Sequence, residues 1–201
     1  MLLGKGYTVF AIEPNDEMRN IAEQSLGHYS NFRSINAQAE KTTLGNSSID
    51  VITAAQSFHW FDQEKAKIEF NRILKPNGFL VLIWNDRLID NSPFQKAYED
   101  LLKKHCPEYK EAKHRDIKRE HLESFYGNKN IKEYVCDNSQ TLDFQGLKGR
   151  LLSSSYCPKK DQNEFLPLMA ALKALFKKYE KNGKVKFEYL TRMFYGQHKS
   201  F

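Results

Sequence analysis

Three short, largely apolar runs constrain the fold of this chain more than any other feature. They cover residues 7–12, 49–55 and 79–84. A continuous apolar run of this length is typical of a strand covered on both faces, as the strands of a parallel sheet are. A weaker strand candidate, residues 32–39, lies between the first two runs.

Segments with a helical period follow the strand candidates. Apolar residues three or four apart predict one helix after residue 15, a second after Asp62 and a third after Ser92. Asp62 and Ser92 are suited to cap helix N-termini, and Pro93 suits a first helical position. We expect residues 75–78 to stop the second helix and turn the chain. The alternation of strand and helix predicts α/β units around a parallel sheet. The residues that share an apolar helix face are Met18, Ile21, Ala22 and Leu26, then Ala66, Phe70, Ile73 and Leu74, then Phe94, Ala97, Tyr98, Leu101 and Leu102.

The second half of the chain has a different pattern. Residues 105–130 are polar and charged and predict no definite element, whereas residues 131–144 favour an extended segment. Residues 163–181 form an amphipathic helical pattern, and residues 185–189 alternate apolar with charged side chains as a strand with one wetter face does. A helix followed by a strand at this point suggests that the last strand is antiparallel and lies at a sheet edge.

Composition excludes several classes of protein. The net charge is +6, but the lysines are interleaved with glutamates as on solvated helix faces, and no basic patch with interleaved aromatics predicts nucleic-acid binding. No run approaches 18 apolar residues, so we expect no membrane-spanning helix. The three cysteines are widely spaced, which predicts no metal site and fits a reducing, cytoplasmic location. Neither a Walker loop nor a Ser-His-Asp arrangement is present.

Glu13 ends the first predicted strand and is the first residue to suggest chemistry. Ligands of open α/β sheets bind beyond the carboxyl ends of the strands, where both oxygens of a carboxylate can accept hydrogen bonds from ribose hydroxyls. The alternative is that Glu13 only caps the next helix. Taken alone, this residue does not separate the two interpretations.

Four segments, in order and spacing, resemble the class I S-adenosylmethionine-dependent methyltransferases, most closely the type 11 group with its trans-aconitate methyltransferase-like members. They are YTVFAIEPNDEM, NAQAE, SSIDVITAAQSFHWFD and FNRILKPNGFLVLIWN. The resemblance implies a Rossmann-like fold with a mostly parallel, doubly wound sheet, an antiparallel last strand and a first strand that is missing. It implies one truncated domain over residues 1–201, with a cofactor-binding half at 1–90 and a substrate-side half at 91–201. A cap over residues 105–160 is compatible with this division.

The resemblance assigns cofactor contacts residue by residue, with S-adenosylmethionine as the cofactor. Glu13 would hold the ribose hydroxyls, and Pro14 and Met18 would pack on the adenine. The family usually carries an acidic residue at the position of Gln38, although an amide oxygen can also accept from an adenine amino group. The full set is Glu13, Pro14, Met18, Gln38, Ala39, Glu40, Ala55 and Gln56.

The implied substrate side includes Ser57, Phe58, His59 and Trp60. A neutral His59 imidazole can take a proton from a nucleophile, and an indole face can help to bind a sulfonium cation. The alternative is that His59 and Trp60 are packing residues at a turn. Arg87 is a candidate to pair with the carboxylate of a small-molecule acceptor, with an ion pair to Asp86 or Asp90 as its alternative.

The glycine-rich loop that is most diagnostic of the family would precede residue 1. Without its strand, the neighbouring strands would have open edges that favour self-association. A fragment, a misplaced start and a stable short protein all remain compatible with this beginning. We therefore carry a methyltransferase, a cofactor-incompetent remnant with a binding or structural role and, as the least favoured, an NAD-dependent oxidoreductase.

Overall fold

The computed structural model describes residues 1–109, 119–127 and 130–197. Within the chain, two compact units form. The first contains Met1–Leu82, Arg119–Lys132 and the chain from Tyr195 onward, and the second contains Ile83–Lys118 and Glu133–Phe194. The predicted single domain divided near residue 90 stays a prediction, as does the cap over 105–160, of which residues 110–118 and 128–129 lie outside the described residues.

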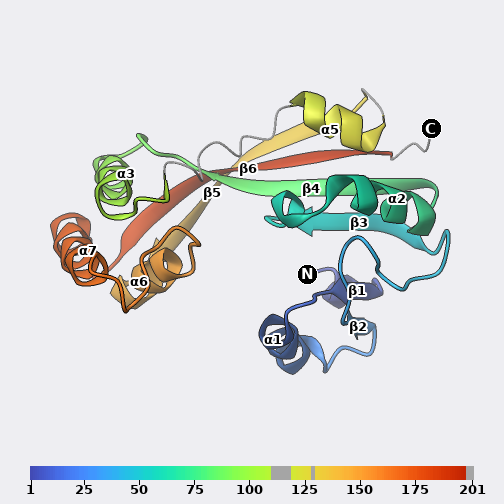
Figure 1. Cartoon of the computed structure of the whole chain (residues 1–201), viewed down its shortest axis with the longest axis horizontal. Coiled ribbons are helices and arrows are strands. Elements are labelled where there is room, and N and C mark those ends of the chain that lie inside the picture. The colour runs from blue at the N-terminus through green and yellow to red at the C-terminus, as the bar shows by residue number, and fades with distance from the viewer. Residues whose placement is uncertain (110–118, 128–129, 198–201) are drawn as a thin grey trace. The chain divides into compact units, whose positions relative to one another are not determined.

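The elements follow one another along the chain as drawn in Figure 1. Those of the first half are η1 (Leu3–Lys5), β1 (Val9–Ile12), α1 (Asp16–Leu26), β2 (Phe32–Ile35), β3 (Ile49–Ala55), η2 (Phe58–Trp60), α2 (Gln63–Ile73), β4 (Leu74–Arg87) and α3 (Pro93–His105). Those of the second half are α5 (Arg119–Tyr126), β5 (Lys132–Leu142), α6 (Phe144–Leu152), α7 (Phe165–Tyr179) and β6 (Val185–Gln197).

The strands form two sheets. β1 pairs in parallel with β2, so that Val9 lies opposite Phe32 and Ile12 opposite Ile35. The other sheet has the order β3-β4-β6-β5, and β3 and β4 run in the same direction in Figure 1. The predicted α/β class with parallel strand pairs is confirmed.

β6 is antiparallel to both of its neighbours. The Leu88 N–H donates to the Glu188 carbonyl, and Thr191 Oγ1 donates to Asn85 Oδ1, so the residue numbers run in opposite senses along β4 and β6. The predicted antiparallel last strand is therefore confirmed. Its predicted place at the sheet edge is wrong, because β6 lies between β4 and β5.

Local sequence signals set the helix starts. The side chains of Asn15, Asp62 and Ser92 accept hydrogen bonds from the backbone N–H groups of the first turns of α1, α2 and α3. These bonds satisfy donors that have no partner inside a helix. Two helices, α5 and α6, were not predicted, because their segments are short and α5 lies in a polar stretch.

Residues 75–78 do not form the predicted turn. α2 ends at Ile73, and β4 begins directly at Leu74 and continues to Arg87. Asn77 takes a left-handed φ of 67°, and a side chain on Gly78 would come within 3.2 Å of the Asp50 carbonyl of β3. The glycine therefore allows β4 to approach β3 closely.

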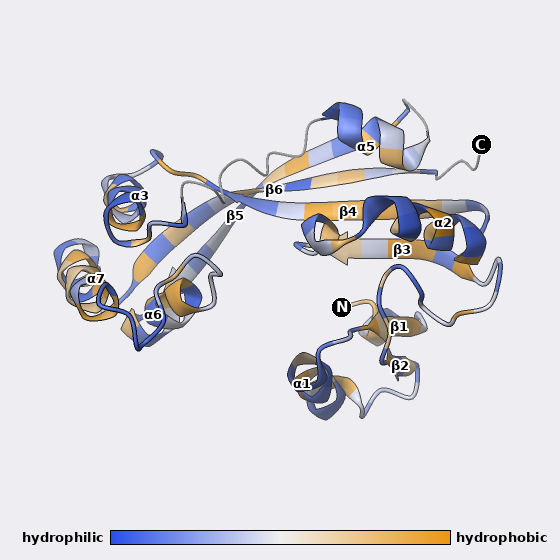
Figure 2. Cartoon of the chain, in the orientation of Figure 1, coloured by the Kyte–Doolittle hydropathy of each residue, from blue (hydrophilic) through white to orange (hydrophobic). Residues whose placement is uncertain are grey.

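The core of the first unit lies around α2, α5 and the first part of β4. Figure 2 shows β4 hydrophobic over most of this part and hydrophilic toward its end. Tyr126 of α5 is fully buried and donates from its hydroxyl to the Leu80 carbonyl of β4 at 3.2 Å. The other residues buried here include Phe58, Ala66, Phe70, Ile73, Leu80, Leu82, Leu122 and Phe125.

β1 and α1 are less covered than the sequence predicts. Phe10 of β1 is 41% exposed, and Met18 and Ile21 of α1 are 61% and 64% exposed. No residue of α1 is buried. The predicted helix exists, but the expectation that β1 is covered on both faces is wrong.

Within the described residues, the outer strands of each sheet have open edges, namely β1 and β2 in one and β3 and β5 in the other. Within the described residues, β1 pairs only with β2, and β3 pairs only with β4. An unpaired edge offers N–H and C=O groups to another strand. The self-association predicted from such edges stays a prediction.

The second unit has its own core between α3, α6, α7 and β6. Phe187 and Tyr189 of β6 are buried against Tyr98 of α3, whose ring meets that of Phe187 edge to face at 4.9 Å. Leu168 and Leu172 of α7 are fully buried in the same cluster. The predicted helix at 163–181 and extended segment at 131–144 correspond to α7 and β5.

Within the described residues, no helix is both long and apolar enough to cross a bilayer. The same part of the chain brings together no group of three acidic, histidine or cysteine side chains that could hold a metal ion.

A buried carboxylate ties α2 to the segment that leads into β3. Glu69 Oε1 accepts hydrogen bonds from the Thr42 N–H at 2.8 Å and the Thr42 hydroxyl at 2.6 Å. Arg72 donates to both carboxylate oxygens, at 2.7 and 2.8 Å, and to the Leu44 carbonyl. The Arg72 hydrogen bonds hold the pKa of Glu69 at about 2, against the opposing effect of burial.

We expect Glu69→Gln to lower the free energy of unfolding by about 2–3 kcal/mol at pH 7, because it removes the charge that Arg72 and Thr42 bind. A folded-state pKa below the ordinary value of 4.5 stabilises the fold fully above about pH 4.5. This contribution is lost as the pH falls toward 2. Urea unfolding followed by tryptophan fluorescence at pH 7 and pH 3 measures the difference, which should shrink at pH 3.

The matched control is Glu64→Gln, on the exposed first turn of the same helix, for which we expect a change below about 0.5 kcal/mol. Equal losses for the two variants, or a loss that does not change with pH, would contradict a special role of the Glu69 carboxylate.

Candidate functional site

Glu13 follows β1 directly, and only one oxygen of its carboxylate accepts a hydrogen bond from the described residues. Oε1 accepts from the Asn15 N–H at 2.9 Å, just before α1 begins. The Glu13 N–H donates to the Ile35 carbonyl, which fixes the end of β1 beside the end of β2. Oε2 makes no hydrogen bond with the described residues. The N-cap of α1 is Asn15, so Glu13 does not cap the helix itself, and its second oxygen can accept a hydrogen bond from a ligand.

Pro14 and Met18 lie exposed beside Glu13. Met18 is 61% exposed, and its N–H is held by the side chain of Asn15 at 2.9 Å. Arg19 donates to the Glu13 carbonyl at 3.1 Å. The backbone of this segment is therefore fixed by several hydrogen bonds, while an apolar, polarizable side chain remains open to contact.

Gln38, Ala39 and Glu40 form a tight turn after β2. The Lys41 N–H donates to the Gln38 carbonyl at 3.0 Å, and the Gln38 side chain is exposed. Glu40 Oε1 accepts from the Asp62 N–H at 2.7 Å. This bond joins the segment after β2 to the segment after β3.

The residues after β3 turn sharply into a short helix. Ala55 is exposed, and Gln56 takes a left-handed φ of 56°. The Trp60 N–H then donates to the Ser57 carbonyl at 2.9 Å, which closes the turn of η2. Asp62 follows as the N-cap of α2, and the hydrogen bond from the Lys65 side chain lowers its pKa.

Phe58 anchors this turn. Its side chain is fully buried and meets the ring of Phe125 edge to face at 4.7 Å and that of Phe61 at 5.9 Å. The next two residues face outward: Trp60 is 65% exposed, and its ring lies 4.9 Å from that of half-buried His59. One buried aromatic side chain therefore holds the turn that presents the imidazole and the indole.

Arg87 lies in the second unit, and its partner is not the one predicted. Its Nη2 donates to Glu99 Oε2 at 2.5 Å and to the Tyr109 hydroxyl at 2.6 Å. Burial raises the pKa of Tyr109, whose hydroxyl donates to the same carboxylate oxygen at 2.6 Å. The predicted alternative partners, Asp86 and Asp90, are wrong, because the ion pair of Arg87 is with Glu99; Asp86 pairs with Arg192 at 3.6 Å.

The first unit brings together most of the predicted site. All of the predicted site residues except Arg87 belong to it, and Arg87 belongs to the second unit. The segments after β1, β2 and β3 are joined by the backbone bond from Glu13 to Ile35 and by the bond from the Asp62 N–H to the Glu40 carboxylate. The roles of these residues toward a cofactor stay predictions.

Sequence reasoning missed the partners of the site residues. It identified Asp62 as a helix cap but not as the donor to Glu40, and it assigned no role to Glu99 or Tyr109. The helical stripe of α3 offered a partial signal, because Glu99 follows Tyr98 and shares its buried side of the helix.

Residues 1–82 match a protein family described as a methyltransferase domain, of the type 11 group. These residues are similar to the class I, type 11 methyltransferase domains. The family implies a cofactor of the S-adenosylmethionine type.

An uncharacterized methyltransferase of Mycobacterium tuberculosis is 34% identical over 86 residues, which are 43% of this chain and 34% of that protein. An uncharacterized methyltransferase of Schizosaccharomyces pombe is 48% identical over 62 residues, which are 30% of this chain and 24% of that protein. The chain thus spans about a quarter to a third of the length of these curated relatives.

Solved structures support the methyltransferase fold beyond residue 82. A candidate type II methyltransferase from Anaeromyxobacter dehalogenans matches with a TM-score of 0.60 and 17% identity, over 96% of this chain and 81% of that one. The YcgJ protein of Bacillus subtilis matches with a TM-score of 0.54 and 16% identity, over 95% and 82%. At these identities the likeness concerns the fold alone, and it confirms the predicted Rossmann-like methyltransferase architecture.

Phe58→Ala should lower the free energy of unfolding of the chain by about 3–5 kcal/mol, since it empties a fully buried aromatic site. Phe58→Leu keeps most of the apolar volume and should cost less than about 1.5 kcal/mol. Thermal and urea unfolding measure both values.

Trp60→Ala is the control, because an exposed side chain should change stability by no more than about 0.5 kcal/mol. If Phe58→Ala cost no more than Trp60→Ala, Phe58 would not be the anchor of the turn.

Proposed function

We propose that this chain takes part in methyl transfer from S-adenosylmethionine to a small-molecule acceptor. The methyltransferase family of residues 1–82 supports the reaction type. The observation that carries the assignment of the cofactor site is the carboxylate of Glu13 at the carboxyl end of β1, with one oxygen used by the backbone and the other available. A strand-ending carboxylate with a free oxygen suits a ribose hydroxyl.

The residues around Glu13 fit the cofactor by their chemistry. The exposed thioether of Met18 suits the face of a purine, and the exposed amide of Gln38 can accept from an amino group. When bound, S-adenosylmethionine supplies a methyl group on a sulfonium, which is a strong leaving group. Ala39, Glu40, Ala55 and Gln56 complete the proposed surface.

On the acceptor side, we propose that Ser57, His59 and Trp60 border the reacting groups. His59 would receive a proton from the acceptor's nucleophile, and the exposed indole of Trp60 would contact the cation through its face. Because the segment is held by buried Phe58, both rings are positioned before any ligand binds.

The chemistry of the acceptor is less constrained. A carboxylate-bearing acceptor was predicted from Arg87, but the guanidinium is already paired with Glu99 and shielded by Tyr109. A carboxylate ligand would have to compete with a buried ion pair, and breaking such a pair is costly. The proposal therefore names a small molecule and does not rest on Arg87.

Glu13→Gln should weaken binding of S-adenosylmethionine and of its demethylated product about ten- to a hundred-fold, the loss expected when hydrogen bonds to a charged group are removed. Isothermal titration into the chain measures the dissociation constants. For the unmodified chain, ligand at about 100 times the dissociation constant should add about 2.7 kcal/mol of stability and raise the melting temperature by several degrees.

Glu17→Gln is the matched control, because Glu17 is an exposed carboxylate one turn away on α1. It should bind both ligands as the unmodified chain does. Equal binding by Glu13→Gln and Glu17→Gln would overturn the assignment of Glu13. A folded chain that binds neither ligand would favour the alternative function, a methyltransferase-like remnant with a binding or structural role.

A further inference from the structure

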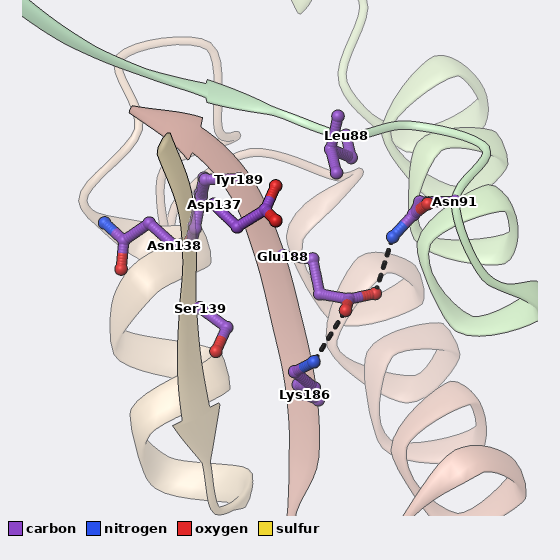
Figure 3. Close-up of a pocket in the computed structure, with 8 residues that line it drawn as sticks. All are labelled: Leu88, Asn91, Asp137, Asn138, Ser139, Lys186, Glu188 and Tyr189. Carbon is purple, nitrogen blue, oxygen red and sulfur yellow. Dashed lines mark hydrogen bonds and ion pairs between the residues drawn. The ribbon is translucent and has the colours of Figure 1, made fainter. Parts of the chain in front are cut away.

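The second unit holds a polar pocket that the proposed reaction does not use. Its cavity volume is about 540 Å³, within the range of small-molecule sites. Figure 3 shows the side chains that line it. They are Leu88, Asn91, Asp137, Asn138, Ser139, Lys186, Glu188 and Tyr189.

The pocket lies over strands β5 and β6, next to the end of β4. Leu88 directly follows the last residue of β4, and residues 137–139 belong to the second half of β5. β4 and β5 are both antiparallel to β6, so their carboxyl ends lie at the same edge of the sheet.

A buried amide fixes the wall of the pocket. Gln95 of α3 is fully buried; its Nε2 donates to the carbonyls of Leu88 and Glu188, and its Oε1 accepts from the Glu188 N–H at 2.9 Å. All three bonds go to the backbone, so they hold β4 and β6 together independently of any ligand. The pocket is therefore largely preformed.

The strand register places four of the lining side chains on one face. Asn138 bonds Thr191, and Tyr189 bonds Gln140, which puts these residues on the face that carries the core. Alternation along the strands then puts Asp137 and Ser139 of β5 and Lys186 and Glu188 of β6 on the opposite face.

The net charge of the pocket is opposite in sign to the net charge of the chain. Glu188 Oε1 accepts from Lys186 at 2.7 Å and Oε2 from Asn91 at 2.8 Å (Figure 3), and the Lys186 hydrogen bond lowers the pKa of Glu188. The Asp137 carboxylate makes no hydrogen bond or ion pair with the described residues. Two carboxylates and one ammonium give the pocket a net charge of −1, in a chain whose net charge is +6.

We propose that this pocket binds a small molecule that carries an ammonium group. The ammonium donates to the carboxylate of Asp137, and a neighbouring donor of the ligand reaches the Ser139 hydroxyl or the outer side of Glu188. An anionic ligand is disfavoured, because the only cation among the lining residues is already paired with Glu188. The proposal does not depend on methyl transfer, since it concerns binding by the second unit alone.

Titrations of the ¹⁵N-labelled full chain with 1,4-diaminobutane, at constant pH and ionic strength, test this proposal. We expect saturable amide shifts at residues 137–139 and 186–189, and none with 1,4-butanediol or succinate at the same concentrations. Asp137→Asn should weaken diamine binding about two- to five-fold, the range for one partly exposed ion pair.

Two further variants sharpen the test. Asp161→Asn removes an exposed carboxylate of the same unit outside the pocket and should leave the affinity unchanged. Lys186→Met frees Glu188 and should strengthen diamine binding by a similar two- to five-fold factor. Shifts scattered over all exposed carboxylates, equal shifts with the diol, or unchanged affinity in Asp137→Asn would overturn the proposal.

Discussion

The antiparallel pairing of β4 with β6 is the constraint on which the second unit depends. It joins residues about 100 positions apart, through the Leu88–Glu188 backbone bond and the buried amide of Gln95. The register puts Phe187 and Tyr189 into the core beside α3 and leaves Lys186 and Glu188 on the other face. A slip of one residue would exchange these two sets. Core and pocket are therefore consequences of the same pairing.

The features that could be predicted from the sequence are those that a few neighbouring residues determine. The helix caps Asp62 and Ser92 could be predicted because a cap and the N–H group from which it accepts are three residues apart. The antiparallel direction of β6 could be predicted from the helix that precedes it, α7. Its place between β4 and β5 was not, because neighbour order in a sheet is a long-range property. The exposure of Met18 and Ile21 was missed for the same reason, since a periodic apolar face does not say whether anything covers it.

In the candidate site, too, some features could be predicted from the sequence and others could not. The position of Glu13 at a strand end was predicted, and the structure confirms it, but the use of one oxygen by the Asn15 N–H depends on how the chain bends into α1. The position of Arg87 after a strong strand was also predicted. Its partner Glu99 lies 12 residues later on the inner side of α3, where burial favours a paired charge over an isolated one. Sequence position located these side chains, whereas packing determined what they contact.

The chemistry of methyl transfer explains why a buried phenylalanine matters to the proposed function as much as His59 does. Displacement at a methyl group requires the nucleophile, the carbon and the leaving sulfur to be aligned, and alignment can supply most of the rate enhancement. A base adds less when the nucleophile is already reactive. The hydrocarbon ring of Phe58 has no group that could take part in the reaction, yet it fixes the turn that presents Ser57, His59 and Trp60. In such a site, packing of the core holds the exposed rings of His59 and Trp60 in position.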